Sequence, residues 1–493
     1  MFGRITPESI GISSSELLRF ASSLHSYTLS PHGIILAKGT DIFFECYYAP
    51  YKVDTLHRMY SVSKSFIALA AGIASEEGLI SLDDKLVKYF PEYAGADKLL
   101  EQTTIRNCLT MRSSMACCAA WYGKPDRAAS YFTVSSNQLP ETSFCYDSAG
   151  SFMVGCAIER ACGKPFLDYL KEKVFDELGF SKNAYSLLAP GGHSHGDSGV
   201  MCTPRDILIF ANLLLGGGVY NGKRYVSEEF VRLMTSRQTD NFNGSTADPL
   251  EVHGYGYLVW KLPRDGFAFV GMANQLMLCD PATELIMIIT SEDMGKEIVG
   301  RTLYFDQLYG RLVPAVEKRA PLAEDKEALS ALSAFAENAS LLSLSGSLSE
   351  NDSALISGVT YYAEENKCGI SSLTLYTDNE GGRLEYMRYG KLHRLDFLYN
   401  RNYFGRFPTE QRMSAVASQY QQGDYACATS AVWCEPRKIH IMSQVIDDYE
   451  GTLHIELAFD KAQGVPERVN AVLNRRAQRI LDDYSGRFIA RRG

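Results

Sequence analysis

The spacing of apolar residues predicts a helix, two strands and a second helix near the start of the chain. Apolar positions recur every three or four residues after Ser13, which favours a helix there. Two short apolar runs at 33–37 and 42–48, joined by a turn, are typical of paired strands. A long helix is predicted from 62 to 77, because one of its faces is apolar and Gly78 follows as a helix end.

The stretch from 80 to 250 predicts mostly helices joined by loops rich in glycine and proline. Strand patterns return at 256–262, 267–271 and 285–290, and a helical pattern follows at 302–318. Because strands come from both ends of this segment, we expect one antiparallel sheet flanked by helices, with a helical insert. The fold class is therefore α+β.

The pattern changes after a charged, alanine-rich stretch. We expect a linker at 319–339, between a first domain at 1–318 and a C-terminal domain at 340–493. Alternating or β-branched runs in the last part predict strands at 373–376, 383–386, 438–445 and 452–459. The C-terminal domain is expected to be β-rich, either a sandwich or a lipocalin-like barrel.

Composition and charge narrow the function classes. The chain has a formal net charge of −9 and no run of lysine or arginine, which argues against a nucleic-acid partner. Its twelve cysteines form no C-x-x-C pair, so neither a zinc site nor a redox motif is indicated, and no metal or other cofactor is predicted. No apolar run reaches about 18 residues, so no membrane span is expected. The many thiols and the absence of a signal-peptide pattern predict a cytoplasmic protein.

The first candidate for chemistry is a serine and a lysine three residues apart, Ser61 and Lys64, at the start of the long predicted helix. Residues i and i+3 share one helix face, so the two side chains would be neighbours. A serine hydroxyl needs a base beside it to act as a nucleophile, and a lysine can serve if burial favours loss of its proton. The simple alternative is a capping serine and a solvated lysine, which a lone S-x-x-K cannot exclude.

A second candidate is Tyr146, within Phe144–Ser148. A phenol near an ammonium group can relay a proton to a leaving group. With 29 tyrosines in the chain, core packing is the simple alternative for this residue.

Three segments together resemble one known superfamily. They are Tyr60–Phe66, Glu77–Asp84 and Thr104–Met111, and their combination and spacing are similar to the class C β-lactamase, DD-peptidase and esterase superfamily of serine hydrolases. The resemblance covers about residues 1 to 315 and implies a β-lactamase/DD-peptidase-like domain. It also implies that Ser61 is acylated, that Lys64 is the base, and that Tyr146, as the tyrosine of a Y-x-N motif, is the acid/base partner.

The sequence departs from that superfamily at two motifs. Ser148 stands where Y-x-N has asparagine. The third motif, K-T-G or H-x-G on an edge strand, is matched by Phe269–Met272, so Phe269 replaces a cation that would face a substrate carboxylate. Gly271 fits the small residue that lets substrate lie along the strand. The backbone N–H groups of Ser61 and Met272 would then form the oxyanion hole.

Other candidates are weaker. Trp121, Tyr122 and His253 are candidate walls of a substrate pocket, with packing as the equal alternative. The loop Gly191–Asp197 holds two histidines without further ligands nearby, which favours a loop at a pocket mouth over a metal site. The K-x-G at Lys367–Gly369 lies in the expected β domain and is interpreted as a turn.

The prediction is a serine hydrolase that cleaves an ester or amide bond of a small molecule through an acyl-Ser61 intermediate. The alternatives are a D-alanyl-D-alanine carboxypeptidase or β-lactamase, and a binding relative without activity. The missing cation at Phe269 and the cytoplasmic expectation favour an esterase or amidase over enzymes that act on carboxylate-bearing substrates outside the cytoplasm. The expected partner is a small-molecule substrate, and the oligomeric state is left open, with a homo-oligomer as one alternative.

Overall fold

The computed structural model divides the chain into two compact units. The first comprises residues 1–340 together with 415–419, and the second comprises 341–414 and 420–493. The residues that the structure describes are 2–115, 124–241, 248–249, 252–318, 320–346, 352–409, 411–416, 419–461, 463–477 and 484–493.

The first unit is built on a seven-stranded sheet whose strands come from both ends of the unit. In spatial order the strands are β1 (Gly3–Arg4), β3 (Asp41–Tyr47), β2 (Pro31–Lys38), β12 (Leu285–Ser291), β11 (Gln275–Asp280), β10 (Phe267–Gly271) and β9 (Trp260–Lys261). Neighbouring strands are antiparallel except β1 and β3, which pair in parallel. The structure therefore confirms the α+β fold class and the sheet assembled from both ends.

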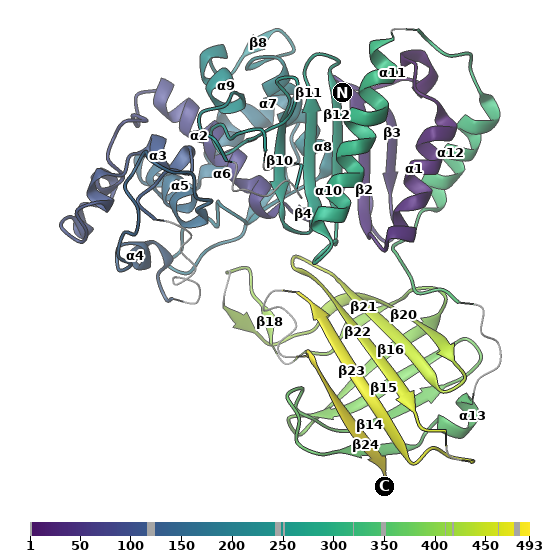
Figure 1. The fold of residues 1–493 in the computed structure, drawn as a ribbon. Helices are drawn as coiled ribbons and strands as arrows, with labels where there is room; N and C mark the ends of the chain where they lie inside the picture. Colours follow the sequence, from purple (N-terminus) through teal and green to yellow (C-terminus); the bar gives the residue numbers. More distant parts are fainter. Residues whose placement is uncertain are drawn as a thin grey trace. The chain divides into compact units, whose positions relative to one another are not determined.

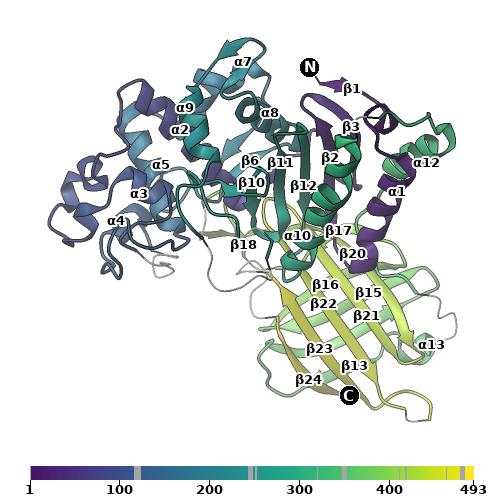
Figure 2. The same ribbon diagram turned by 45° about the horizontal axis from the view of Figure 1, so that its top comes forward.

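Helices cover both faces of this sheet (Figure 1). On one face α8 (Pro204–Leu215) packs on β2, β11 and β12. On the other face lie α1 (Ser14–Ser23), α10 (Glu297–Phe305), α11 (Val313–Glu317) and α12 (Lys326–Asn338), as the turned view also shows (Figure 2). Each of these helices buries an apolar stripe on the sheet or on a neighbouring helix, as its spacing of apolar residues requires.

The remaining helices gather beside the β10 end of the sheet (Figure 1). They are α2 (Ser63–Glu76), α3 (Ile105–Leu109), α4 (Arg127–Tyr131), α5 (Ser148–Cys162), α6 (Phe166–Leu170), α7 (Asp176–Leu178) and α9 (Glu228–Thr235). Helix α2 packs against α5, α6 and α9 and is buried from Ser63 to Ala74, so it is apolar on nearly every face. Three short strands, β4 (His57–Arg58), β6 (Val200–Cys202) and β5 (Tyr185–Ser186), form a separate sheet beside it.

Some expected elements have different bounds. Within 256–262 only Trp260 and Lys261 form a strand, because the tight turn before them pairs Tyr255 with Trp260. Strand β11 (Gln275–Asp280) was not expected as a separate strand and fills the gap between β10 and β12. The helical pattern at 302–318 corresponds to the end of α10, a π-helical stretch and α11.

The stretch expected as a linker contains a helix. Helix α12 (Lys326–Asn338) begins at Asp325, whose carboxylate accepts from the Ala328 N–H, and it packs against α1. The alanine-rich pattern that suggested a linker is thus a surface helix with one buried leucine, Leu332. The domain boundaries at 319–339 stay a prediction.

The second unit is a closed β-barrel, which confirms the barrel alternative of the predicted fold class. Its strands in order are β16 (Lys391–Tyr399), β15 (Gly381–Arg388), β14 (Ile370–Thr377), β13 (Thr360–Ala363), β24 (Gly486–Arg492), β23 (Arg468–Arg476), β22 (Glu450–Phe459), β21 (Lys438–Ile446), β20 (Tyr425–Glu435) and β17 (Tyr403–Phe407). A parallel pairing of Leu398 with Ser430 joins β16 to β20 and closes the ring. Lys367–Gly369 forms the turn before β14, as expected.

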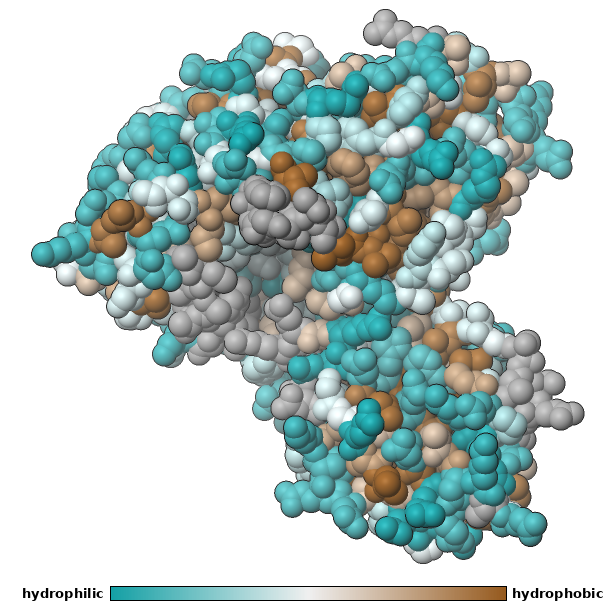
Figure 3. Space-filling model, viewed as in Figure 1, coloured by the Kyte–Doolittle hydropathy of each residue, from teal (hydrophilic) through white to brown (hydrophobic). Residues whose placement is uncertain are grey.

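Side chains fill the described interior of the barrel. Apolar side chains such as Leu373 on β14 and Ile439 on β21 are buried there together with polar ones such as Ser443, and a cavity lined by Ile370, Tyr386 and Phe488 among others measures about 10 Å³, the space of one water molecule at most. On the face shown in Figure 3, apolar residues form separate areas within a mostly hydrophilic surface. None of the helices formed by the described residues has both the length and the apolar character needed to cross a bilayer.

Candidate active site

Ser61 lies in a 3₁₀ turn, Tyr60–Val62, that leads directly into α2. The preceding residue, Tyr60, has φ of +45°, in the left-handed region that residues other than glycine rarely adopt. Such backbone conformations persist only where the surrounding structure enforces them, and they gather at functional sites. The turn leaves Ser61 partly exposed while the residues on either side of it are buried.

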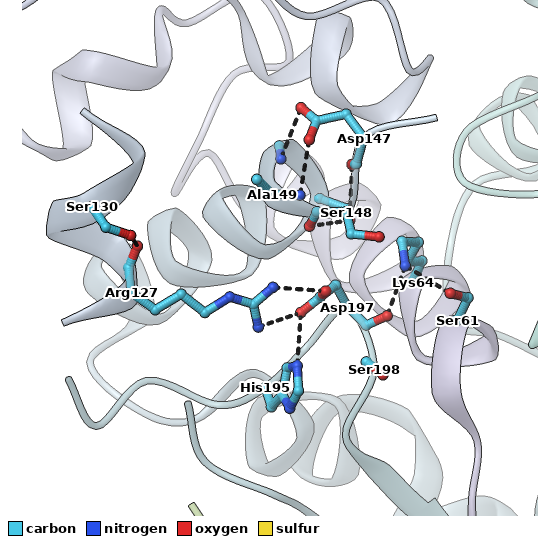
Figure 4. Close-up of polar contacts among 12 residues, drawn as sticks. Ser61, Lys64, Arg127, Ser130, Asp147, Ser148, Ala149, His195, Asp197 and Ser198 are labelled. Atoms are coloured by element: carbon cyan, nitrogen blue, oxygen red, sulfur yellow. Dashed lines mark hydrogen bonds and ion pairs between the residues drawn. The ribbon is translucent and has the colours of Figure 1, made fainter. Parts of the chain in front are cut away.

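Lys64 is almost completely buried and points back toward Ser61 (Figure 4). Its ammonium group donates to Ser61 Oγ at 2.9 Å and to the backbone carbonyl oxygen of Asp197 at 2.8 Å. Among the described residues, no carboxylate oxygen lies within 4.0 Å of the Lys64 ammonium group. The predicted neighbourhood of Ser61 and Lys64 is therefore present, and the solvated lysine of the simple alternative is not.

The loop that carries Asp197 is fixed to the start of α2 by backbone and side-chain bonds. Ser198 O accepts from Arg58 Nε at 2.9 Å, and the Val200 N–H donates to Ser63 Oγ at 3.0 Å. The Met59 N–H donates to Val200 O at 2.8 Å, beside the pairing of β4 with β6. These bonds hold the acceptor for Lys64 in register with the Ser61 turn.

Asp197 itself is fully buried and forms an ion pair with Arg127 of α4. The Arg127 guanidinium donates to both Asp197 carboxylate oxygens, at 2.9 and 2.8 Å, and His195 Nε2 lies 3.5 Å from one of them (Figure 4). Burial alone would raise the pKa of Asp197, but the positive charges of Arg127 and Lys64 outweigh it and lower that pKa to about 2. Burial lowers the pKa of His195 well below its usual range, so this histidine is neutral beside a charged carboxylate.

Tyr146 comes to the same site from the segment before α5. The Lys64 ammonium lies 5.1 Å from the centroid of the Tyr146 ring. Asp147 caps α5 by accepting from the Ala149 and Gly150 N–H groups, and Ser113 Oγ donates to it at 2.9 Å. Because this cap is buried, it fixes the backbone next to Tyr146, and burial raises the pKa of Asp147.

An aromatic cluster surrounds Tyr146. The Trp260 ring stacks on it at a centroid distance of 5.7 Å, and Tyr255 meets Trp260 edge-on at 4.9 Å. Phe144 completes the cluster at 5.3 Å from Tyr255. Burial and the nearby Tyr146 raise the pKa of Tyr255 well above its usual range, so the Tyr255 hydroxyl stays protonated. Trp260 is thus a candidate wall of the substrate pocket that the sequence analysis did not name.

Ser148 is the first residue of α5, and its side chain points toward Lys64 (Figure 4). The structure therefore brings four of the predicted side chains to one place: Ser61, Lys64, Tyr146 and Ser148.

The end of β10 lies beside the Ser61 turn. A Cβ atom on Gly271 would meet the backbone oxygen of Met59 at 2.5 Å, so only glycine allows this approach. The chain then turns through Met272, Ala273 and Asn274, with positive φ at the last two. Met272 is thus close to the Ser61 turn, and its role as an oxyanion donor stays a prediction.

A buried carboxylate supports this turn from behind. Asp293 accepts from Ser30 N at 2.9 Å and from Asn274 Nδ2 at 3.1 Å, and its own N–H donates to Ala273 O. Ser291 Oγ donates to Ala273 O at 2.6 Å and to Asp293. Burial, which these bonds offset only in part, raises the pKa of Asp293 to about 6.

This raised pKa has a measurable consequence for stability. The charged form of Asp293 costs folding free energy above about pH 6, and the cost disappears as the pH falls toward the unfolded value near 4. Wild type should gain about 2 kcal/mol of stability over Asp293→Asn between pH 7 and pH 4, since only wild type takes up this proton on folding over that range. Urea unfolding of both proteins across that range measures the difference, and parallel curves would contradict it.

Other predicted residues lie elsewhere. Phe269 is 1% exposed and packs on Phe210 of α8 at a centroid distance of 4.8 Å, so its ring lies in the core. His253 stacks on Phe305 of α10 at a centroid distance of 6.3 Å. Trp121 and Tyr122 lie outside the described residues.

The loop Gly191–Asp197 does not bring its histidines together as ligands. His193 Nδ1 lies 2.8 Å from a Glu159 oxygen, whereas His195 turns inward to Asp197. The sequence analysis noted this loop but named neither Asp197 nor Arg127 as a site residue. The buried acidic residue at the end of a glycine-rich loop was the available signal for Asp197, and no local pattern marked Arg127.

The segments that carried the resemblance pack together. Arg106 forms a two-bonded ion pair with Asp83, at 2.7 and 2.8 Å, and donates to the Tyr257 hydroxyl at 2.5 Å. Thr104 caps α3 in a capping box with Asn107. Ser65 Oγ donates to Leu258 O, so the same loop is also tied to α2. These contacts place the Ser61 helix relative to the Tyr255–Trp260 turn.

The sheet assembled from both ends of the first unit and the Ser-x-x-Lys pair where a buried helix begins are features that the resemblance implied. The chain belongs to the beta-lactamase family: the model of that family matches residues 34–309, more than half of the 493 residues. The resemblance found in the sequence is thereby confirmed.

Similar proteins carry hydrolase and esterase names. A 6-aminohexanoate-dimer hydrolase of Paenarthrobacter ureafaciens is 24% identical over 276 residues, which covers 52% of this chain and 70% of that protein. A structure titled putative 6-aminohexanoate-dimer hydrolase from Bacillus anthracis is 17% identical, with a TM-score of 0.51, and covers 62% of this chain and 83% of its own. A family VIII carboxylesterase structure is also 17% identical, with a TM-score of 0.50, and the match covers 64% of this chain and 98% of that one. At these identities the two structures show the shared fold alone.

Proposed function

We propose that this protein is a serine hydrolase that cleaves an ester or amide bond of a small molecule through an acyl-enzyme at Ser61. The observation that carries the proposal is the 2.9 Å contact between Ser61 Oγ and a buried Lys64 without a carboxylate partner among the described residues. A lysine whose nitrogen lies within hydrogen-bond distance of the serine oxygen is placed to exchange a proton with it.

The proposed acylation uses groups of this chain throughout. Ser61 Oγ forms a bond to the acyl carbon, and its proton passes to Lys64 in the amine form or to Tyr146 as phenolate. The leaving group takes that proton from Lys64 or Tyr146 as its bond to the acyl carbon breaks, which restores the amine or phenolate. Water then adds to the acyl-enzyme, releases the acid and restores the Ser61 hydroxyl. The N–H groups of Ser61 and Met272 would stabilise the oxyanion in both steps.

The choice of ester or amide over a carboxylate-bearing lactam or peptide rests on the third motif. Its first position is Phe269, a core residue that offers no cation to a substrate carboxylate. A similar protein is named 6-aminohexanoate-dimer hydrolase, after an amide substrate that itself carries a carboxylate, so that name supports the type of bond and not the absence of a carboxylate. Because one fold serves many chemistries, the name guides the substrate panel and does not replace it.

The proposal is tested by covalent labelling with a fluorophosphonate and mass spectrometry. Trypsin cleaves after Arg58 and Lys64, so the adduct is expected on the hexapeptide 59–64 and, by fragmentation, on Ser61. Ser63→Ala is the matched control for the site of labelling, since Ser63 is in the same peptide but is fully buried, and its adduct is still expected on Ser61. Ser61→Ala is expected to remain unlabelled.

The substrate class is tested on the same preparations. We expect turnover of short-chain p-nitrophenyl esters or of the 6-aminohexanoate dimer, and none of nitrocefin. Efficient nitrocefin turnover would favour the β-lactamase alternative. A wild type that is neither labelled nor active would contradict the proposal and favour a binding relative without activity.

A further inference from the structure

We propose that Arg127 and Asp197 are positioning residues for the reaction at Ser61. Their ion pair holds the Asp197 carbonyl oxygen against Lys64 and balances the charge beside it. The inference rests on the proposed function, because it concerns the group that would exchange a proton with Ser61. It adds two residues from outside the motifs that contain Ser61 and Tyr146.

The pair is rigid and completely enclosed. Both side chains are at most 3% exposed, and the guanidinium and carboxylate share two parallel bonds of 2.9 and 2.8 Å. Arg127 is held in turn by its N–H, which donates to Pro190 O at 2.9 Å, and by the Phe152 ring, 4.1 Å from its guanidinium carbon. Arg127 therefore links α4 and α5 to the loop that ends in Asp197.

Asp197, the acidic member of this ion pair, also contacts Lys64. The Asp197 side chain binds Arg127, while its backbone oxygen accepts from Lys64 at 2.8 Å. That oxygen is the second acceptor that keeps the ammonium group pointed at Ser61. If the Asp197 carboxylate lost its partner, the loop would relax and the carbonyl oxygen would move, so Lys64 would no longer be held in place.

The pair also sets the charge balance around Lys64. Titratable and charged groups face this region from every element packed around it. They are Ser61 in the turn before α2, Arg58 on β4, Arg127 on α4, Tyr146 and Asp147 before α5, Cys156 on α5, and His195 and Asp197 on the loop. Since Arg127 and Asp197 cancel each other, removal of either one leaves a lone buried charge near Lys64.

Removal of the negative charge and removal of the positive charge should therefore shift the deprotonation of Lys64 in opposite directions. In Asp197→Asn the uncompensated guanidinium disfavours the ammonium form of Lys64, so the amine form is present at lower pH. In Arg127→Gln the uncompensated carboxylate favours the ammonium form, so higher pH is needed. The double variant carries neither charge and should behave like wild type in this respect.

The experiment measures the rate of fluorophosphonate labelling of the full chain between pH 5 and pH 10. We expect the acid limb of the rate profile to move down by about one pH unit in Asp197→Asn and up by about one unit in Arg127→Gln. In the double variant the limb should return to the wild-type position. Arg127→Lys keeps the charge but loses the two-bonded geometry, so its limb should stay in place while its maximal rate falls about tenfold.

Controls separate this role from simple stabilisation. Glu45→Gln breaks another partly buried ion pair, with Arg205, between β3 and α8. It is expected to lower thermal stability without moving the acid limb. Should one single variant fail to fold, the other single variant, the double variant and Arg127→Lys still report the limb and the maximal rate.

If the acid limb of the labelling rate lies at the same pH in wild type and in both single variants, and Arg127→Lys labels at the full rate, this inference is overturned while the proposed function stands. Shifts of both single variants in the same direction would also overturn it, since charge balance demands opposite signs. Absence of labelling at Ser61 in wild type would instead overturn the proposed function, and the inference with it. The two failures are thus distinguishable on the wild-type protein.

Discussion

Ser61→Ala is expected to lower kcat/KM for any substrate found in the panel by at least about 10³-fold, with KM changed little. The substitution removes the only atom that could form the acyl bond in the proposed reaction. The oxyanion donors would remain, which is why a small residual rate is expected rather than none. Steady-state kinetics on purified wild type and variant measure the effect.

The fold should survive this change, because the Ser61 side chain is partly exposed and small. The variant loses one bond from Lys64, so its melting temperature is expected to lie within a few degrees of wild type. Ser63→Ala is the opposite control: it removes the acceptor for the Val200 N–H inside the core and should cost stability more than turnover. A Ser61→Ala protein that keeps a tenth of the wild-type activity would exclude an acyl-Ser61 mechanism.

The sequence was sufficient for features that depend on local spacing. Ser61 and Lys64 are three residues apart on one helix, so their contact follows from helix geometry once the helix is recognised. The strand patterns at both ends of the first unit likewise predicted a single sheet, because their apolar runs had no other partner. Apolar residues that repeat every two positions indicate strands, and those that repeat every 3.6 positions indicate helices, so both kinds of element can be read from the sequence.

Contacts made through backbone atoms or across long loops could not be predicted in the same way. Lys64 bonds the carbonyl oxygen of Asp197, 133 residues away, and any residue can supply a carbonyl. Arg127 meets Asp197 across 70 residues, and nothing near either one marks the pairing. Such contacts depend on how α4 and the loop pack, which a pattern of apolar positions does not specify.

Phe269 shows a related limit. Strand alternation correctly puts Phe269 and Gly271 on one face of β10, but it does not say what covers that face. In the structure Phe210 of α8 packs there, so the aromatic ring is a core residue, while the end of the strand approaches Met59. The match of Phe269–Met272 to the third motif stays a prediction, and the surroundings of the Phe269 side chain required the packed structure.

Lys64→Met is expected to lower kcat/KM by about 10²- to 10⁴-fold, the range typical for loss of a general acid–base group. Methionine has a similar length and is apolar, so it fills the space that Lys64 occupies in the core. Two effects on stability oppose each other: a buried charge is removed, and the Asp197 carbonyl oxygen loses its donor. We therefore expect a melting temperature within a few degrees of wild type.

Lys64→Arg distinguishes proton exchange from charge alone. A guanidinium keeps the positive charge but does not lose its proton at neutral pH, so the variant should be as inactive as Lys64→Met if the lysine acts as a base. If Lys64 only stabilised negative charge, the arginine variant would keep much of the activity. Rates measured up to pH 10 for wild type, Lys64→Met and Lys64→Arg separate the two roles, because only a group that must lose its proton gives wild type an acid limb that both variants lack.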